Sequence, residues 1–156
     1  MNKLPERKRI RLKGFDYSYG TCYFVTICTR QKRCILSSIE PIGQPPVARV
    51  QLSPLGQIAQ ECLIELGQSR SGVIVDSFVI MPNHIHVLLI IDNSEATPID
   101  LHRVVRYLKS SITKKAGESL FQPRFFDHII RDEFDYENHR NYIESNPENW
   151  ETDELR

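Results

Sequence analysis

Apolar and polar residues recur along the chain in patterns that predict four strands and three helices. Runs rich in β-branched and aromatic residues predict strands at 21–29, 73–80, 85–91 and 125–130. Apolar positions recur at helical spacing over 54–66 and 99–115, and a last helix is expected over 135–146. The predicted order is strand, helix, strand, strand, helix, strand, helix.

Local signals predict where several elements begin and end. Ser53 followed by Pro54 is typical of a helix start, because serine caps free N–H groups and proline needs no partner there. Thr97 is the candidate cap of the second helix, Gly117 its stop, and Pro147 ends the third.

Two connections complete this picture. Proline-rich residues 40–46 predict a loop, because proline removes backbone donors. The short connection 81–83 makes the two middle strands an antiparallel pair. The element order predicts an α+β, ferredoxin-like fold: a split βαβ antiparallel sheet with helices on one face, plus a C-terminal helix.

Composition indicates one globular domain spanning 1–156, with a basic N-terminal arm (1–15) and an acidic tail (147–156). Apolar residues make up 40% of the chain, and apolar runs such as 87–91 are far shorter than the ~18 residues a membrane span needs. The N-terminus lacks the apolar segment of a secretory signal, so a cytoplasmic protein is expected. We therefore expect four buried, reduced thiols: Cys22, Cys28, Cys34 and Cys62.

The net charge of zero conceals a segregated distribution. Residues 1–33 carry nine basic groups against two acidic ones, and 98–131 carry seven against three. Residues 132–156 reverse the sign, with nine carboxylates against two arginines. Such segregation produces either a positive surface for a nucleic acid or ordinary solvated faces.

His84 and His86 stand two apart at the start of a predicted strand. Side chains alternate faces along a strand, so both imidazoles project the same way. Such a pair suits a divalent cation, although hydrogen-bonded histidines at a strand end are a plain alternative. The remaining histidines, His102, His128 and His139, are isolated in the sequence, and no chemistry is expected of them.

Tyr142 and Asn146 lie four apart on the last predicted helix and so share one face. If that face meets the two histidines, the Asn146 side-chain oxygen completes a metal shell and Tyr142 lies beside the metal. The alternative is a core tyrosine followed by an asparagine cap.

The sequence resembles a known family at several points in chain order. The His-x-His strand after a Met-Pro turn resembles the HUH motif of the single-tyrosine transposases of the IS200/IS605 type, and the REP-associated tyrosine transposases in particular. The resemblance extends through 13–17, 23–28, 105–109 and 122–131, and ends with Tyr142-Ile143 and Asn146-Pro147.

The resemblance implies roles for four residues and a reaction. His84, His86 and Asn146 match the metal ligands, and Tyr142 matches the nucleophile. The implied enzyme is a metal-dependent transposase that nicks and rejoins single-stranded DNA at hairpins through a 5′-phosphotyrosine. Mg²⁺ or Mn²⁺ is the expected cofactor, and the mixed ligand set also suits Zn²⁺.

If the protein has this function, we expect its basic residues to contact the phosphates of the DNA backbone. Dimers among the relatives favour a homodimer. Two other functions remain open. One is a non-catalytic, ferredoxin-like nucleic-acid-binding module. The other is a metal-dependent hydrolase that uses water instead of Tyr142. The expected DNA contacts are Arg9, Arg11, Lys13, Arg103, Arg106, Lys109, Lys114 and Arg124.

Overall fold

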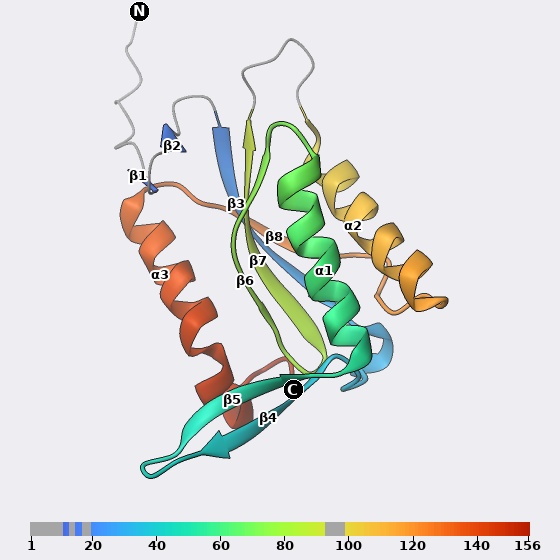
Figure 1. Ribbon diagram of the computed structural model, residues 1–156. Coiled ribbons are helices and arrows are strands. Elements are labelled where there is room, and N and C mark those ends of the chain that lie inside the picture. The colour runs from blue at the N-terminus through green and yellow to red at the C-terminus, as the bar shows by residue number, and fades with distance from the viewer. Residues whose placement is uncertain (1–10, 13–14, 17–19, 93–98) are drawn as a thin grey trace, which may run out of the picture.

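A four-stranded antiparallel sheet forms the centre of the molecule (Figure 1). The computed structural model describes residues 11–12, 15–16, 20–92 and 99–156. The strand order is β6-β7-β3-β8, and all three pairings are antiparallel. This order confirms the predicted ferredoxin-like sheet. The strands are β3 (Gly20–Cys28), β6 (Val73–Ile80), β7 (His84–Asp92) and β8 (Phe126–Ile129).

Helices cover both faces of the sheet. Helices α1 (Pro54–Ser69) and α2 (Leu101–Ala116) pack on one face and form the larger apolar core with β3, β6 and β7. Helix α3 (Glu133–Ser145) covers the opposite face, where Tyr136 and Ile143 join a second apolar cluster. A short helical segment, η3 (Asn146–Thr152), continues from α3 (Figure 1).

The central strand β7 is buried almost throughout because helices cover both of its faces. Ile85 and Val87 belong to the cluster under α1 and α2, whereas Leu88 and Ile90 belong to the cluster under α3. The alternation of side chains along a strand therefore directs His84 and His86 toward the α3 face.

Several predicted boundaries are confirmed by capping contacts. The Ser53 hydroxyl accepts a hydrogen bond from Gly56 N at 3.1 Å at the start of α1. Gly117 ends α2 in the left-handed conformation, with φ of +77°. The α2 cap is Asp100, whose carboxylate accepts from His102 N at 3.1 Å, while Thr97 lies outside the described residues.

The predicted loop over 40–46 is wrong. A β-hairpin occupies this region, formed by β4 (Ser37–Ile42) and β5 (Val47–Leu52), and its turn takes only residues 43–46. Pro41 is tolerated because β4 pairs only with β5, so a missing donor on its other edge breaks no ladder. The hairpin meets η3, where Ala48 N donates to Glu148 Oε1 at 2.8 Å.

Three smaller findings complete the fold. Residues Arg11–Leu12 (β1) and Phe15–Asp16 (β2) form a short antiparallel pair, and Arg30–Lys32 form a short helical turn, η2. The prediction that all four thiols are buried is wrong for Cys34, which is exposed, and all four are free. Among the described residues, no helix is long and apolar enough to cross a membrane.

Candidate functional site

The His84 and His86 side chains lie together at the beginning of β7, with ring centroids 4.5 Å apart. Each Nδ1 has a neighbour that holds the ring: Asn83 Oδ1 lies 2.7 Å from His84 Nδ1, and Thr26 Oγ1 lies 2.8 Å from His86 Nδ1. Both rings are buried, at 0% and 2% exposure. The two imidazoles are therefore fixed in orientation with Nε2 as the remaining nitrogen of each.

Three buried polar atoms at this place have no hydrogen-bond partner among the described residues: His84 Nε2, His86 Nε2 and Asn146 Oδ1. Such orphaned groups are costly, because burial removes their water without supplying a replacement. Two imidazole nitrogens and an amide oxygen form a donor set that a divalent cation satisfies. The residues present therefore fit a metal ion.

An acidic residue that the sequence reasoning missed adjoins the same site. Asp153 Oδ2 lies 3.7 Å from His84 Nε2, and Asn146 Nδ2 donates to the same oxygen at 3.3 Å. The Asp153 side chain is only 2% exposed. Leu155 N donates to its other oxygen at 2.8 Å, which fixes the carboxylate. Asp153 comes directly after η3, which ends at Thr152, and the sequence gives no local signal that this segment returns to the histidines.

The electrostatics keep both histidines neutral. Burial, together with the neighbouring His84 and His139, lowers the pKa of His86 to about 3. Burial also lowers the pKa of His84, although the Asp153 carboxylate opposes that shift. Neutral imidazoles are the form that ligates metals.

Tyr142 stands at the mouth of this site with its ring centroid 5.2 Å from that of His86. It is 42% exposed, in contrast to Tyr136 on the same helix, which is 1% exposed. Burial raises the Tyr142 pKa, and the charge of Asp153 adds to the shift. Tyr142, His86, Asn146 and Asp153 all line one open pocket of about 780 Å³.

The structure thus brings together all four residues that the sequence singled out. The helix α3 supplies Tyr142, and its C-terminal cap is Asn146, which is 1% exposed. The alternative of a core tyrosine is wrong for Tyr142, which is 42% exposed, whereas its other half, Asn146 as a helix cap, agrees with the structure. The expectation that His128 and His139 are isolated is wrong, since both contact Asp135.

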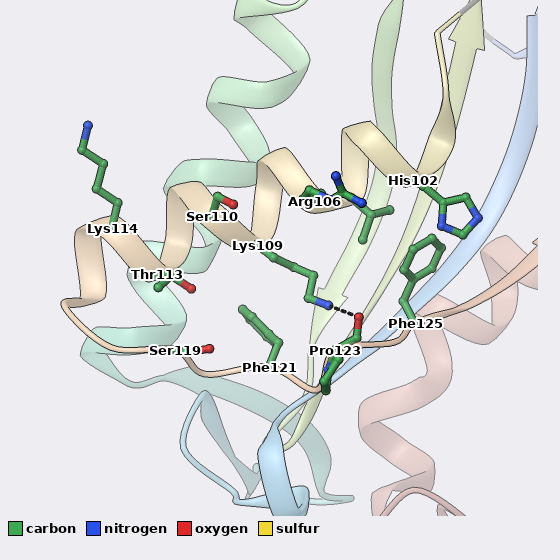
Figure 2. A pocket seen from close by; sticks show the side chains of 11 residues that line it. His102, Arg106, Lys109, Ser110, Thr113, Lys114, Ser119, Phe121, Pro123 and Phe125 are labelled. Carbon is green, nitrogen blue, oxygen red and sulfur yellow. Dashed lines mark hydrogen bonds between the residues drawn. The ribbon is translucent and has the colours of Figure 1, made fainter.

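The basic residues of α2 border a second pocket of about 490 Å³ (Figure 2). This pocket lies on the side of the sheet that α1 and α2 cover. Arg106 and Lys114 line it with exposed side chains, and Phe121 and Phe125 provide apolar walls. Lys109 also lines it, but its ammonium group donates to the carbonyls of Gln122 and Pro123 at 2.6 and 3.2 Å.

The other predicted DNA contacts divide into two groups. Arg103 and Arg124 are exposed. Arg9 and Lys13 lie outside the described residues, and the Arg11 side chain is likewise not described.

Comparison with known proteins shows similarity to transposases. No protein-family profile matches it. It is 32% identical over 175 residues to an uncharacterized protein of Haemophilus influenzae, covering 97% of this chain and 94% of that protein. It is 27% identical over 145 residues to the REP-associated tyrosine transposase of Escherichia coli, covering 92% of this chain and 73% of the transposase.

Two solved structures share its fold. One is a REP-associated tyrosine transposase bound to a REP hairpin, with a TM-score of 0.64 and 23% identity over 90% of this chain and 74% of that one. The other is described as a candidate transposase of Deinococcus radiodurans, with a TM-score of 0.55 and 16% identity. The match covers 86% of this chain and 97% of that one. The sheet, the three helices and their order are therefore those of a transposase fold. The chain is thus similar in sequence to one REP-associated tyrosine transposase and shares the fold of another.

Proposed function

We propose that this protein cleaves and rejoins single-stranded DNA beside a hairpin through a covalent 5′-phosphotyrosine at Tyr142. One observation carries the proposal: the accessible Tyr142 phenol shares one open pocket with His86 and Asn146, which carry buried, orphaned ligand atoms, and His84 with a third such atom lies beside His86. An accessible tyrosine beside a cation site is the arrangement that covalent phosphoryl transfer requires.

His84, His86 and Asn146 are the residues that hold the divalent ion, and Asp153 is a fourth candidate ligand. Mg²⁺ and Mn²⁺ favour the two oxygen donors, and Zn²⁺ the two imidazoles. When bound there, the ion supplies Lewis-acid polarisation of a non-bridging phosphate oxygen. The hydrogen bonds to Nδ1 of each histidine hold Nε2 in place for it.

Tyr142 supplies the nucleophile. Its oxygen attacks the phosphorus, the P–O3′ bond breaks, and the DNA 3′-hydroxyl leaves while the 5′-phosphate stays on the tyrosine. The new ester retains the energy of the broken one, so rejoining needs no nucleotide triphosphate. Since helix α3 carries both Tyr142 and the Asn146 cap, any shift of this helix moves the nucleophile and a ligand together.

Exposed cations on α2 support the binding of a DNA backbone. Arg103, Arg106 and Lys114 are exposed and have no ion-pair partner in the described part of the chain, so their charges are available to phosphates. Lys109 instead holds the 122–123 backbone. The solved relative in complex with a REP hairpin supports a folded single strand as the ligand. A homodimer and a cytoplasmic location, both expected from the sequence, remain part of the proposal.

The test is adduct formation on a pool of labelled, hairpin-bearing single strands in the presence of Mn²⁺, followed by a denaturing gel. We expect a labelled band that co-migrates with the protein and disappears with protease. DNA binding without any adduct would favour the non-catalytic nucleic-acid-binding module. Cleavage without an adduct would favour a hydrolase that uses water.

A further inference from the structure

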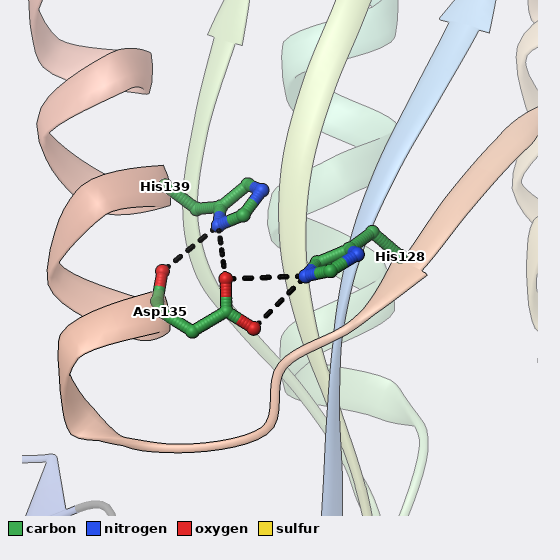
Figure 3. A group of neighbouring side chains, drawn as sticks. All are labelled: His128, Asp135 and His139. Atoms are coloured by element: carbon green, nitrogen blue, oxygen red, sulfur yellow. Dashed lines mark hydrogen bonds and ion pairs between the residues drawn. The ribbon is translucent and has the colours of Figure 1, made fainter.

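Three side chains outside the cation site form a connected cluster between β8 and α3 (Figure 3). The Asp135 carboxylate stands in the middle. His128 Nε2 lies 2.9 Å from Asp135 Oδ2, and His139 Nδ1 lies 3.0 Å from Asp135 Oδ1. The two imidazole rings stack with centroids 4.7 Å apart.

The surroundings of His139 determine which nitrogen carries its proton. Its Nδ1 faces two oxygens that only accept, the Asp135 carboxylate and the Asp135 backbone carbonyl, the latter at 2.8 Å. Nδ1 must therefore donate, and a neutral His139 keeps its free lone pair on Nε2. Figure 3 shows this second nitrogen directed away from Asp135.

The Asp135 carboxylate orients the His139 ring, and its own contacts favour its ionised form. Burial favours a higher pKa for its carboxyl group, but hydrogen bonds from His128 and from Arg131 N outweigh that effect and lower the pKa. The Arg131 N–H donates to Oδ2 at 3.0 Å. An ionised carboxylate that is fixed by several donors orients the imidazole that donates to it.

His139 also belongs to the pocket of the tyrosine. It lies three residues before Tyr142 on α3, and such pairs share a helix face. Both side chains line the pocket that contains His86 and Asn146. Phe24 neighbours both side chains, with its ring centroid 4.7 Å from that of His139 and 6.0 Å from that of Tyr142.

We propose that His139, oriented by Asp135, is the residue that protonates the departing 3′-oxygen. The inference rests on the proposed function. The Tyr142 Oη–P bond forms, the P–O3′ electron pair goes to O3′, and the Nε2 proton of protonated His139 moves onto that oxygen. The phenol proton goes to solvent water, and His139 is left neutral. In rejoining, neutral His139 takes the proton from the attacking 3′-hydroxyl and so regains its protonated form, while the released Tyr142 oxygen takes a proton from solvent water.

The geometry favours an acid that stands apart from the nucleophile. In an in-line displacement the leaving oxygen departs on the side of the phosphorus opposite to the attacking oxygen. A group that protonates it must therefore stand away from the tyrosine oxygen, across the phosphate. His139 and Tyr142 are separate side chains of one pocket, each beside the Phe24 ring, so the pocket offers an acid and a nucleophile from different positions.

A second metal at the cluster is the competing use of the same three side chains. The observed contacts argue against it. Asp135 already accepts from Arg131 N and both histidines at hydrogen-bond distances, and His139 Nδ1 is turned toward acceptors. A cation there would have to displace these donors.

The test compares two DNA strands that wild-type protein cleaves, one with an ordinary scissile phosphate and one with sulfur in place of the 3′-bridging oxygen. A thiolate leaves without being protonated. We expect His139→Gln to slow adduct formation on the ordinary strand by about 10²–10⁴-fold. On the sulfur strand it should come within about tenfold of wild type. Asp135→Asn should show the same rescue, because its effect acts through His139.

Glu137→Gln, an exposed side chain on the same helix, is the control and should react like wild type on both strands. His128→Gln removes one donor to Asp135 and should give a smaller loss than His139→Gln, with the same rescue. Equal loss on both strands in His139→Gln, or no loss on either, would overturn the role of His139 while leaving the phosphotyrosine proposal intact. A second Mn²⁺ per chain that is absent from both His128→Gln and His139→Gln would assign the cluster to a metal instead. Absence of a wild-type adduct on either strand would contradict the proposed function itself.

Discussion

His86 Nδ1 lies 2.8 Å from the hydroxyl of Thr26 on the neighbouring strand, which leaves Nε2 as the nitrogen that faces the site. The register places the two residues directly opposite each other on β3 and β7. The sheet therefore orients the imidazole before any ion arrives. A preoriented ligand loses less conformational entropy on binding than a free side chain does.

The first prediction concerns the cation. We expect Mn²⁺ binding, measured by isothermal titration, to vanish in the double variant His84→Ala, His86→Ala, because both orphaned imidazole nitrogens are removed. Asp153→Asn should weaken binding by about 10- to 100-fold if its carboxylate contacts the ion. The exposed Glu151, changed to Gln, serves as the control. Equal binding by the wild type and the double variant would exclude this site.

The second prediction separates two tyrosines on one helix. Tyr142→Phe should abolish the covalent DNA adduct with a change in stability of under about 0.5 kcal/mol, because the side chain is half-exposed. Tyr136→Phe should retain the adduct but lose about 1.5–3 kcal/mol in urea unfolding, because the Tyr136 hydroxyl donates to Asp76 at 2.7 Å. An adduct that persists in Tyr142→Phe would remove this residue from the nucleophile's role.

The third prediction concerns salt. Affinity for single-stranded DNA should fall with salt, and the log–log slope should become shallower by about 0.7 for each phosphate that the protein no longer binds. Changing Arg103, Arg106 and Lys114 to Ala should therefore flatten the slope. Lys115→Ala is the control on the same helix, because this ammonium is paired with Glu65 at 2.7 Å. A slope that the triple change leaves unaltered would show that these cations are merely solvated.

The fourth prediction uses the cysteines. Burial raises the pKa of Cys22 to about 12 and also raises those of Cys28 and Cys62, so these thiols carry very little thiolate at pH 8. Cys34 is exposed. We expect a thiol-disulfide reagent to modify Cys34 rapidly in the native protein and the other three only after unfolding. Cys34→Ser should abolish the fast phase; rapid modification that survives this change would contradict the burial.

The sequence alone predicts much of the sheet and the four principal site residues. The alternation of apolar residues identifies the strands, and the helical period identifies α1 and α2, because these patterns are local. The hairpin of β4 and β5 escapes such reasoning, since Pro41 and the adjacent glycine and prolines are typical of a loop. Its stability depends on strand pairing and on the contact of Ala48 with Glu148, one hundred positions apart.

The chemistry divides in the same way. Spacing determines that His84 and His86 share a strand face and that Tyr142 and Asn146 share a helix face, because those relations follow from backbone geometry. Only the tertiary structure decides that α3 packs over the face that carries the histidines, that Asp153 joins them, and that His139 meets Asp135 beside the same pocket. These contacts join separate elements, and their positions depend on how whole apolar faces pack rather than on any local spacing.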